Sequence, residues 1–397
     1  MKKVLEGVTV IDFTQAYSGP FCTMQLADFG ARVIKIERSK YGDQSRYWAP
    51  INEAGESGYY AAINRGKESI TLNIGTPEGL EIAKKLIAKA DIMLENFSVG
   101  SMEKKGLGYE AVKEINPEII YGSISGYGQN TSWRKLPAYD NVIQAQTGLM
   151  EMTGTADGVP TKVGVSVGDN YTGLEMSLAV AMAYFNKLRT GKGQYIDIAM
   201  YDTLFEIMEG PILTYELEGI ESTRCGNTDP TLFPYDVYPC KDGYFSPGVA
   251  AGSKKEWKAF CEAIQMPELL ENERWMSNDN RLEDYDELTA KVLPFFAERT
   301  KEELREIFNA YKIPNAPVNT IPELLEDPQL EAREMLIPMD DPSVGPYKAT
   351  GNPMKLSETP AVIETPAPKL GQHTEAVLAE LGYSAEDIAS LREAKAI

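Results

Sequence analysis

Apolar and polar positions predict strands and helices in alternation along the first 125 residues. Short runs rich in β-branched and apolar side chains have the length of buried strands. They cover residues 8–13, 31–37, 70–73, 92–94 and 119–124. Residues 15–20 are predicted as a turn, followed by a helix over 21–29 that stops at Gly30. A second helix begins at Thr76, a predicted N-cap, with Pro77 in its first position. This alternation predicts a parallel sheet covered by helices.

The rest of the chain favours a second, smaller domain. Residues 170–189 form a long predicted helix of small and apolar side chains. Further along, proline-rich turns alternate with helices dense in acids, and the tail carries two short helices with Thr374 and Ser384 as predicted N-caps. We therefore expect the α/β class. A Rossmann-like parallel-sheet large domain would cover residues 1–220, and a smaller α+β domain residues 221–325.

Composition narrows the classes of function. The 397 residues are 43% apolar and 25% charged, which is ordinary for a folded protein, and 59 acids against 39 bases give a net charge of −20. A strongly acidic chain is a poor partner for nucleic acid or for an anionic membrane. No signal peptide is expected, because Glu6 interrupts the first apolar run. The longest apolar run, residues 178–185, is too short to span a bilayer. The four cysteines show no pairing motif, so we expect reduced thiols and a cytoplasmic protein.

A single histidine, His373, narrows the chemistry further. Ser-His-Asp hydrolysis and histidine-rich metal sites are disfavoured, so no metal site is expected. The glycine fingerprints for dinucleotides and for nucleoside triphosphates are both missing from the sequence. The reaction is therefore expected to depend on carboxylates, lysines, tyrosines or cysteines.

Charge is distributed unevenly along the chain. Residues 1–110 hold 14 basic and 14 acidic side chains, so the whole net charge of −20 falls on the remaining 287 residues. Many of these bases lie in or beside glycine turns. They are Lys35, Arg38, Lys40, Arg46, Arg65, Lys67, Lys104 and Lys105. Each by itself is typical of a solvated surface, but together they predict that this region receives an anion.

Asp169 is the candidate for chemistry that the residues themselves single out. It lies in the segment 164–170, between a glycine turn and the long apolar helix. Aspartate is a preferred N-cap, and capping could be its whole role. The same position would also keep a carboxylate ionised beside free backbone N–H groups, with Gly168 leaving room for a substrate, so that it could act as a nucleophile. From the residues alone both interpretations stay open.

Eight short motifs, in order along nearly the whole chain, show a family resemblance. They lie at residues 10–13 with 18–20, 26–37, 42–46, 64–67, 95–97, 126–129, 190–194 and 370–374. The chain resembles the family III coenzyme A transferases, the group that contains formyl-CoA transferase and carnitine CoA-transferase. The resemblance implies transfer of CoA from an acyl-CoA donor to a small free carboxylic acid, both being substrates, with no permanently bound cofactor.

The resemblance also assigns residues. It implies that Asp169 attacks the thioester, forming first a mixed anhydride and then an aspartyl thioester, and that Tyr17, Tyr139 and Asp140 lie in the substrate pocket. CoA contacts carry over to Ser18, Arg38, Leu72, Asn73, Asn96, Phe97 and Lys104. The large domain would bind CoA, residues 326–397 would return to it, and two chains would form an interlocked homodimer. Residues 249–254 correspond to a glycine-rich loop of formyl-CoA transferase.

Two other functions remain as alternatives. An α-methylacyl-CoA racemase-like enzyme would share the scaffold, but racemases use a histidine base where this chain has Tyr139-Asp140, so this alternative is disfavoured. A non-catalytic CoA-binding protein would bind CoA without turnover of any carboxylate.

Overall fold

A computed structural model describes residues 3–250 and 253–397, which fall into two compact units. The first unit contains residues 3–149, 163–218 and 328–397. The second contains Met150–Lys162 and Gly219–Asp327. The segment Met150–Lys162 thus groups with the second unit, although its position in the chain had placed it in the large domain.

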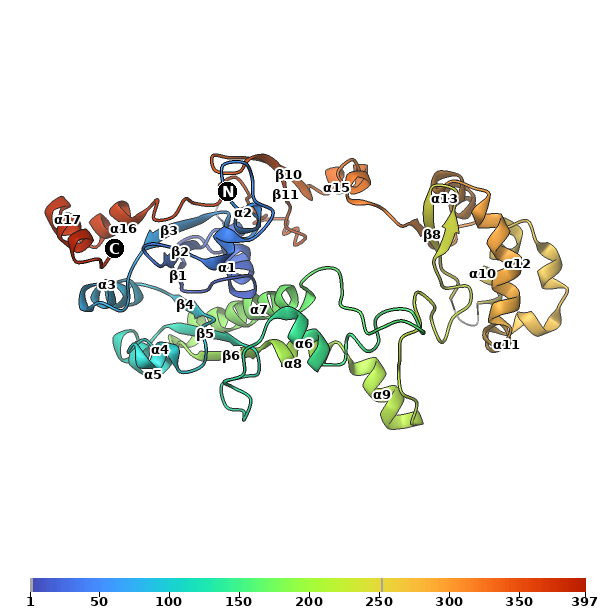
Figure 1. The fold of residues 1–397 in the computed structure, drawn as a ribbon, viewed down its shortest axis with the longest axis horizontal. Coiled ribbons are helices and arrows are strands. Elements are labelled where there is room, and N and C mark those ends of the chain that lie inside the picture. The colour runs from blue at the N-terminus through green and yellow to red at the C-terminus, as the bar shows by residue number, and fades with distance from the viewer. Residues whose placement is uncertain (1–2, 251–252) are drawn as a thin grey trace. The chain divides into compact units, whose positions relative to one another are not determined.

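A six-stranded sheet, with every neighbouring pair parallel, forms the centre of the first unit, as predicted. Its strands lie in the order β3-β2-β1-β4-β5-β6 (Figure 1). They are β1 (Thr9–Asp12), β2 (Arg32–Glu37), β3 (Lys67–Thr71), β4 (Ile92–Glu95), β5 (Ile120–Ser125) and β6 (Tyr195–Ala199). Val10 pairs with Val33 on one side and with Ile92 on the other, so β1 and β4 are neighbours at the point where the strand order reverses.

Helices cover both faces of this sheet because successive strand side chains point to opposite sides. Ile11 and Ile34 share one apolar core with α3 (Pro77–Ile87), α5 (Tyr109–Ile115), α16 (Thr374–Glu380) and α17 (Ala385–Glu393). Val10 and Val33 share the other with α1 (Ser18–Asp28), α7 (Val167–Thr190) and α8 (Met200–Glu206). The other elements are η1 (Gln44–Tyr47), α2 (Gly58–Asn64), α4 (Ser101–Lys104), α6 (Asp140–Gln146), α9 (Glu209–Glu218), α15 (Pro328–Ala332) and the hairpin of β10 (Leu336–Asp341) and β11 (Gly345–Thr350).

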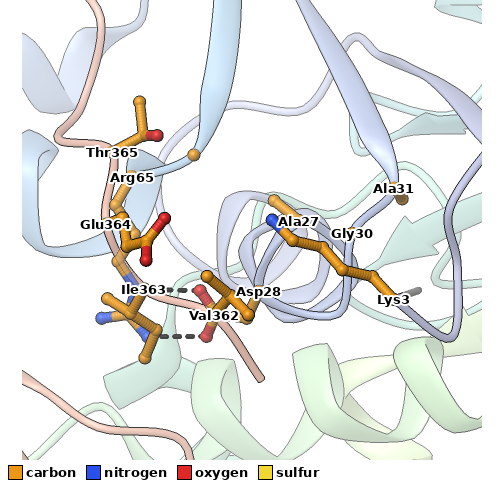
Figure 2. Close-up of a pocket in the computed structure, with 11 residues that line it drawn as sticks. Lys3, Ala27, Asp28, Gly30, Ala31, Arg65, Val362, Ile363, Glu364 and Thr365 are labelled. Atoms are coloured by element: carbon orange, nitrogen blue, oxygen red, sulfur yellow. Dashed lines mark hydrogen bonds and ion pairs between the residues drawn. The ribbon is translucent and has the colours of Figure 1, made fainter. Parts of the chain in front are cut away.

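The C-terminal part of the first unit is attached through a buried ion pair. Figure 2 shows the guanidinium of Arg65 against the carboxylate of Asp28, beside the segment 362–365. The two N···O distances of this ion pair are 3.0 and 2.8 Å. A third Arg65 nitrogen donates to the carbonyl of Thr350, and the Val362 N–H donates to the carbonyl of Asp28. These contacts join chain segments about three hundred residues apart, so residues far along the sequence can complete a site on the sheet.

The second unit is an antiparallel sheet packed against helices. Its strands are β7 (Tyr238–Cys240), β8 (Gly243–Pro247) and β9 (Asn315–Pro317). Its helices are α10 (Lys254–Ala263), η2 (Pro267–Leu270), η3 (Glu273–Met276), α11 (Asn278–Glu283), α12 (Tyr285–Ala297), α13 (Lys301–Ala310) and α14 (Ile321–Leu324). Aromatic side chains dominate its core, among them Trp257, Phe260 and Phe296, which are fully buried.

Several predicted boundaries were wrong. Strand β3 begins at Lys67 rather than at residue 70, because a buried lysine is paired inside the protein and so hides the strand signal. Helix α1 begins at Ser18, so the predicted turn residues Gly19 and Pro20 lie in its first turn, where proline is tolerated. Thr374 is the first residue of α16 and not its cap. Among the described residues we find no helix with the length and apolar character needed to cross a membrane.

Candidate active site

The candidate site lies at the carboxyl ends of β1 and β4. In doubly wound sheets these ends form a crevice where the connections of neighbouring strands leave in opposite directions. The segment after β1 leads through Gln15 to Ser18, and the segment after β4 supplies Asn96 and Phe97. Most of the predicted CoA and substrate residues therefore come from loops at one edge of the sheet.

Asp169 lies in the first turn of α7, as the third helical residue rather than as the N-cap. Ser18, at the start of α1, lies beside the Asp169 carboxylate, where the Ser18 backbone N–H and hydroxyl favour the ionised form. Burial, with the nearby negative charge of Asp140, raises the pKa of Asp169 to about 7, although the hydrogen bonds from Ser18 oppose this. The Asp169 carboxylate is thus only partly ionised near neutral pH.

Asp140 provides the cap that α7 needs. Its Oδ1 accepts the Gly168 N–H at 2.7 Å and lies 3.4 Å from the Asp169 nitrogen. Its Oδ2 accepts from Gln144 Nε2 at 2.6 Å, and Gln144 Oε1 accepts the Val163 N–H at 2.9 Å. The Gly168 N–H is therefore bound to Asp140, and a second carboxylate is fixed beside Asp169.

A glycine permits close approach between the two helices that meet here. A Cβ atom at Gly173, one turn beyond Asp169, would lie 2.5 Å from the Ser18 carbonyl oxygen and 3.0 Å from the ring of Phe21. Only glycine allows α7 to lie this close to α1, and this contact brings Ser18 within reach of the Asp169 carboxylate.

Two tyrosine side chains lie next to the carboxylates. The Tyr17 hydroxyl donates to Asn170 Oδ1 at 3.0 Å, and its ring packs edge-on against Tyr59, which in turn packs against Trp48. Burial, together with the charge of Asp169, raises the pKa of both tyrosines. We did not predict Tyr59, Trp48 or Gln144 from the sequence. Trp48 and Tyr59 flank a stretch that contains proline and glycine and has no periodic signal. The side chain of Tyr139, just before α6, is 62% exposed.

Buried lysines hold the loop that carries Tyr17 and Ser18. Lys35 is fully buried, donates to the Thr14 carbonyl at 2.8 Å and pairs with Asp43 at 2.9 Å. Asp43 also accepts the N–H of Ala16, a residue with a left-handed φ of 69°. Such a backbone conformation is costly for alanine and persists only where the surroundings impose it. The loop is thus held in one conformation by charge-assisted hydrogen bonds.

The second buried lysine acts at the other end of the loop. Lys67 donates to the Pro20 carbonyl at 2.9 Å and to Asn64 Oδ1 at 2.8 Å, and it lies 3.3 Å from Asp12. Burial lowers the pKa of Lys67 to about 8. Burial by itself would raise the pKa of Asp12, but the positive charges of Lys67 and Lys35 keep that pKa below its ordinary value. Asp12 is therefore an ionised partner inside the protein.

Asn96 and Glu95 hold backbone atoms of the site. Asn96 accepts the Gln15 N–H at 2.9 Å and donates to the Gln15 carbonyl at 2.7 Å, so its amide is turned toward this loop. Glu95 accepts the Phe97 N–H at 2.9 Å and a hydrogen bond from Ser123. Burial raises the pKa of Glu95 to about 7. The two residues join the loop after β1 to the loop after β4.

A cavity of about 830 Å³ opens beside these loops. Of the residues expected to contact CoA, Arg38, Leu72, Asn73 and Phe97 line it. Lys105 lines the cavity in the place expected of Lys104, which is the last residue of α4. The remaining lining residues include Phe13, Lys40, Tyr41, Arg392 and Lys395. Ser18 lies beside Asp169 instead, and Asn96 contacts Gln15 in the loop that leads to Ser18.

Other expectations about the site concern a metal and a loop. In the parts of the chain that the structure describes, no group of three or more His, Cys, Asp or Glu side chains could hold a metal ion. Of the loop 249–254, residues 251–252 lie outside the described residues. The single histidine has a structural contact, since His373 Nδ1 accepts the Ser69 N–H at 3.1 Å.

Known proteins resemble this chain over nearly its whole length. The family model described as CoA-transferase family III matches residues 5–374. A succinyl-CoA:mesaconate CoA-transferase of Haloarcula marismortui is 38% identical, covering 95% of this chain and 96% of its own. A human succinyl-CoA:glutarate CoA-transferase is 36% identical, with coverage of 96% and 86%.

A solved structure agrees with these relatives. The CAIB/BAIF family protein from Brucella suis superimposes with a TM-score of 0.87 at 34% identity, covering 96% of this chain and all of that one. The resemblance first seen in eight short motifs is confirmed by both sequence and fold. The chain belongs to family III of the CoA-transferases and is a CoA-transferase.

Proposed function

We propose that this CoA-transferase works through a covalent intermediate on Asp169. The observation that carries the proposal is the position of its carboxylate, which lies buried in the first turn of α7 with Ser18 and the charge of Asp140 beside it. A carboxylate on a rigid helix, shielded from bulk water, can attack a thioester that is bound against it.

In the first step an Asp169 carboxylate oxygen attacks the thioester carbonyl of the donor. The C–S bond breaks, CoA leaves as the thiolate, and a mixed anhydride of the acyl group with Asp169 remains. The thiolate then attacks the aspartyl carbonyl and releases the donor acid as its carboxylate, leaving an aspartyl CoA thioester. The acceptor carboxylate reverses these steps and leaves as its own CoA thioester. No proton is gained or lost overall, so the scheme requires no histidine base.

The surroundings of Asp169 suit this role. An aspartate at its ordinary pKa is a weak nucleophile, and burial beside Asp140 makes the Asp169 carboxylate more basic, with a pKa of about 7. Tyr17 and Tyr59 are both placed to contact the acyl group, because their rings lie next to this carboxylate. CoA itself would extend from here into the cavity past Phe97.

We further propose that donor and acceptor are dicarboxylic. Relatives spanning almost all of this chain are named for succinyl-CoA with mesaconate or with glutarate, which supports succinyl-CoA as the donor. A panel of acceptors tests this. Dicarboxylates of four to six carbons should give kcat/KM at least tenfold above the monocarboxylates of equal length. Equal rates for both classes would remove dicarboxylate specificity from the proposal without affecting the role of Asp169.

Trapping tests the intermediate. Protein mixed with succinyl-CoA and then hydroxylamine should carry a hydroxamate on the peptide containing Asp169, identified by mass, and Asp169→Ala should lose both label and CoA exchange. Asp157→Asn, an exposed aspartate in the second unit, is the matched control and should keep both. A label at another residue, or CoA exchange by Asp169→Ala, would contradict the proposal. Deuterium exchange at the α-carbon would favour a racemase, and CoA binding without any turnover a silent binding protein.

A homodimer and a cytoplasmic location belong to the same proposal. Five large apolar side chains of α7 form an exposed stripe at helical spacing, which supports a dimer contact. They are Leu174, Leu178, Met182, Phe185 and Leu188. Light scattering should give twice the chain mass, and Leu178→Glu with Met182→Glu should reduce it. A wild-type protein that is active as a stable monomer would exclude the dimer, interlocked or not.

A further inference from the structure

The last turn of the chain forms part of the wall of the large cavity. Arg392 and Lys395, from the end of α17, lie on that wall together with Arg38, Lys40 and Lys105, which follow β2 and α4. Among the described residues that line the cavity, Glu37 is the one acid, and it forms an ion pair with Arg46 at 2.7 Å. Five cations therefore converge in a chain whose net charge is −20. Such a cavity favours a ligand with several negative charges.

The two cations of the tail are held in place by packing and by backbone bonds. Ile388 and Leu391 of α17 are buried in the core of the sheet. After the helix, Lys395 adopts a left-handed φ of 56°, and Ala396, fully buried, accepts the Asn73 N–H at 2.8 Å. Asn73 Nδ2 also donates to the Lys395 carbonyl at 3.2 Å. The tail is thus bonded to the segment after β3 that lines the same cavity.

Position in the sheet indicates which part of CoA meets these cations. The tail contacts the segment after β3, whereas Gln15 and Ser18 follow β1, two strands away in the order β3-β2-β1. With strands about 4.8 Å apart, the tail lies roughly 10 Å along the edge from the start of the active-site loop. The thioester must lie at Asp169, so the opposite end of the substrate, the nucleotide, points toward β3 and α17.

We propose that Arg392 and Lys395 bind the 3′-phosphate of the nucleotide and make the enzyme select CoA over dephospho-CoA. The inference rests on the proposed function, in which CoA lies in this cavity. Arg392 pairs with Glu375 at 2.5 Å, but both side chains are more than half exposed. Such a pair contributes little free energy, so a phosphate can replace Glu375 as the partner of Arg392. Arg38 and Lys40, nearer to the reacting end, remain for the diphosphate.

Steady-state kinetics with succinyl-CoA and with succinyl-dephospho-CoA tests the assignment. In the wild type, loss of the 3′-phosphate should raise KM roughly 10- to 100-fold, since each charged hydrogen bond contributes about tenfold. Arg392→Gln with Lys395→Asn should raise KM for succinyl-CoA by a similar factor, leave kcat within about twofold, and leave KM for the dephospho substrate unchanged. Asparagine suits position 395 because it tolerates a left-handed conformation.

Two further variants separate this inference from the proposed function. Lys192→Gln removes an exposed charge in the turn after α7 and should not change either KM. Arg38→Gln should raise KM for both substrates, because the diphosphate is common to them. If Arg38→Gln leaves both values unchanged, CoA does not lie in this cavity and the proposed site fails. Suppose instead that Arg38→Gln raises both KM values. The assignment of the 3′-phosphate is then overturned if Arg392→Gln with Lys395→Asn raises both KM values equally or changes neither of them. Unchanged thermal unfolding of the tail variant shows that it is folded.

Discussion

Replacing Asp140 by asparagine should make Asp169 more acidic and shift the pH dependence of catalysis. In the native protein the pKa of Asp169 rises from an ordinary 3.8 to about 7, first through burial and second through the charge of Asp140. This rise corresponds to about 4 kcal/mol of unfavourable ionisation. The substitution removes the charge but keeps an oxygen that can accept the Gly168 N–H, now at 2.7 Å from Asp140.

The expected fall in the pKa of Asp169 follows from the relative size of its two causes, of which burial is the larger and the charge of Asp140 the smaller. A neighbouring like charge shifts a pKa by about 1 to 3 units, and here it is the smaller cause, so we expect a fall of about 1 unit, to near 6. At pH 6 the ionised fraction of Asp169 would then rise from about one-tenth to about one-half. Because the ionised form is the nucleophile, the acid limb of the rate profile should move down by about 1 pH unit.

The assay is the pH dependence of kcat/KM for CoA transfer between succinyl-CoA and a dicarboxylate, from pH 5 to 9. The midpoint of the acid limb is compared rather than the absolute rate, since the asparagine amide faces Gln144 Nε2 and loses the 2.6 Å hydrogen bond that Asp140 accepts. Gln144→Met is the matched control, because it removes the same hydrogen bond but keeps the charge of Asp140. It should lower the rate without moving the midpoint.

A midpoint that stays near 7 in Asp140→Asn would refute this reasoning, because the Asp140 charge would then have no effect on the nucleophile. A shift of equal size in Gln144→Met would attribute the effect to altered geometry instead of charge.

Other predictions follow from the same site. Asp169→Asn should raise the free energy of unfolding by about 2–4 kcal/mol at pH 8 and by almost nothing at pH 4, as measured by thermal unfolding. The reason is that a raised carboxyl pKa destabilises the native state only as the pH rises above the pKa of the unfolded state, near 4, so equal effects at both pH values would contradict this. Gly173→Ala places a methyl group 2.5 Å from the Ser18 carbonyl oxygen and should lower kcat at least tenfold, while circular dichroism shows that the fold persists. Full activity of this variant would show that the close contact between α7 and α1 is not required. Asn96→Leu breaks both hydrogen bonds to Gln15, so it should lower the free energy of unfolding by about 2 kcal/mol and also lower kcat. An unchanged kcat would mean that the loop after β1 does not need these two hydrogen bonds.

The basic residues of the first 110 positions show what sequence reasoning can and cannot resolve. We predicted that they receive an anion as a group. In the structure Lys35, Lys67, Arg46 and Arg65 are each paired with an acid, and only Arg38, Lys40 and Lys105 of the eight line the cavity. Charge counting cannot separate these two sets, because the partners Asp43, Asp12, Glu37 and Asp28 are brought to them by pairing of strands and helices.

The sequence by itself determined the parallel α/β sheet and the family, because strand and helix periodicity and short ordered motifs are local properties of the chain. It also singled out Asp169, from a glycine turn that precedes an apolar helix. Only the tertiary structure decided that Asp140 caps α7, that Tyr59 lies beside the carboxylates, and that Arg392 and Lys395 reach the cavity. These residues come from separate elements, and folding brings them together through long-range contacts that carry no signature in any one stretch of sequence.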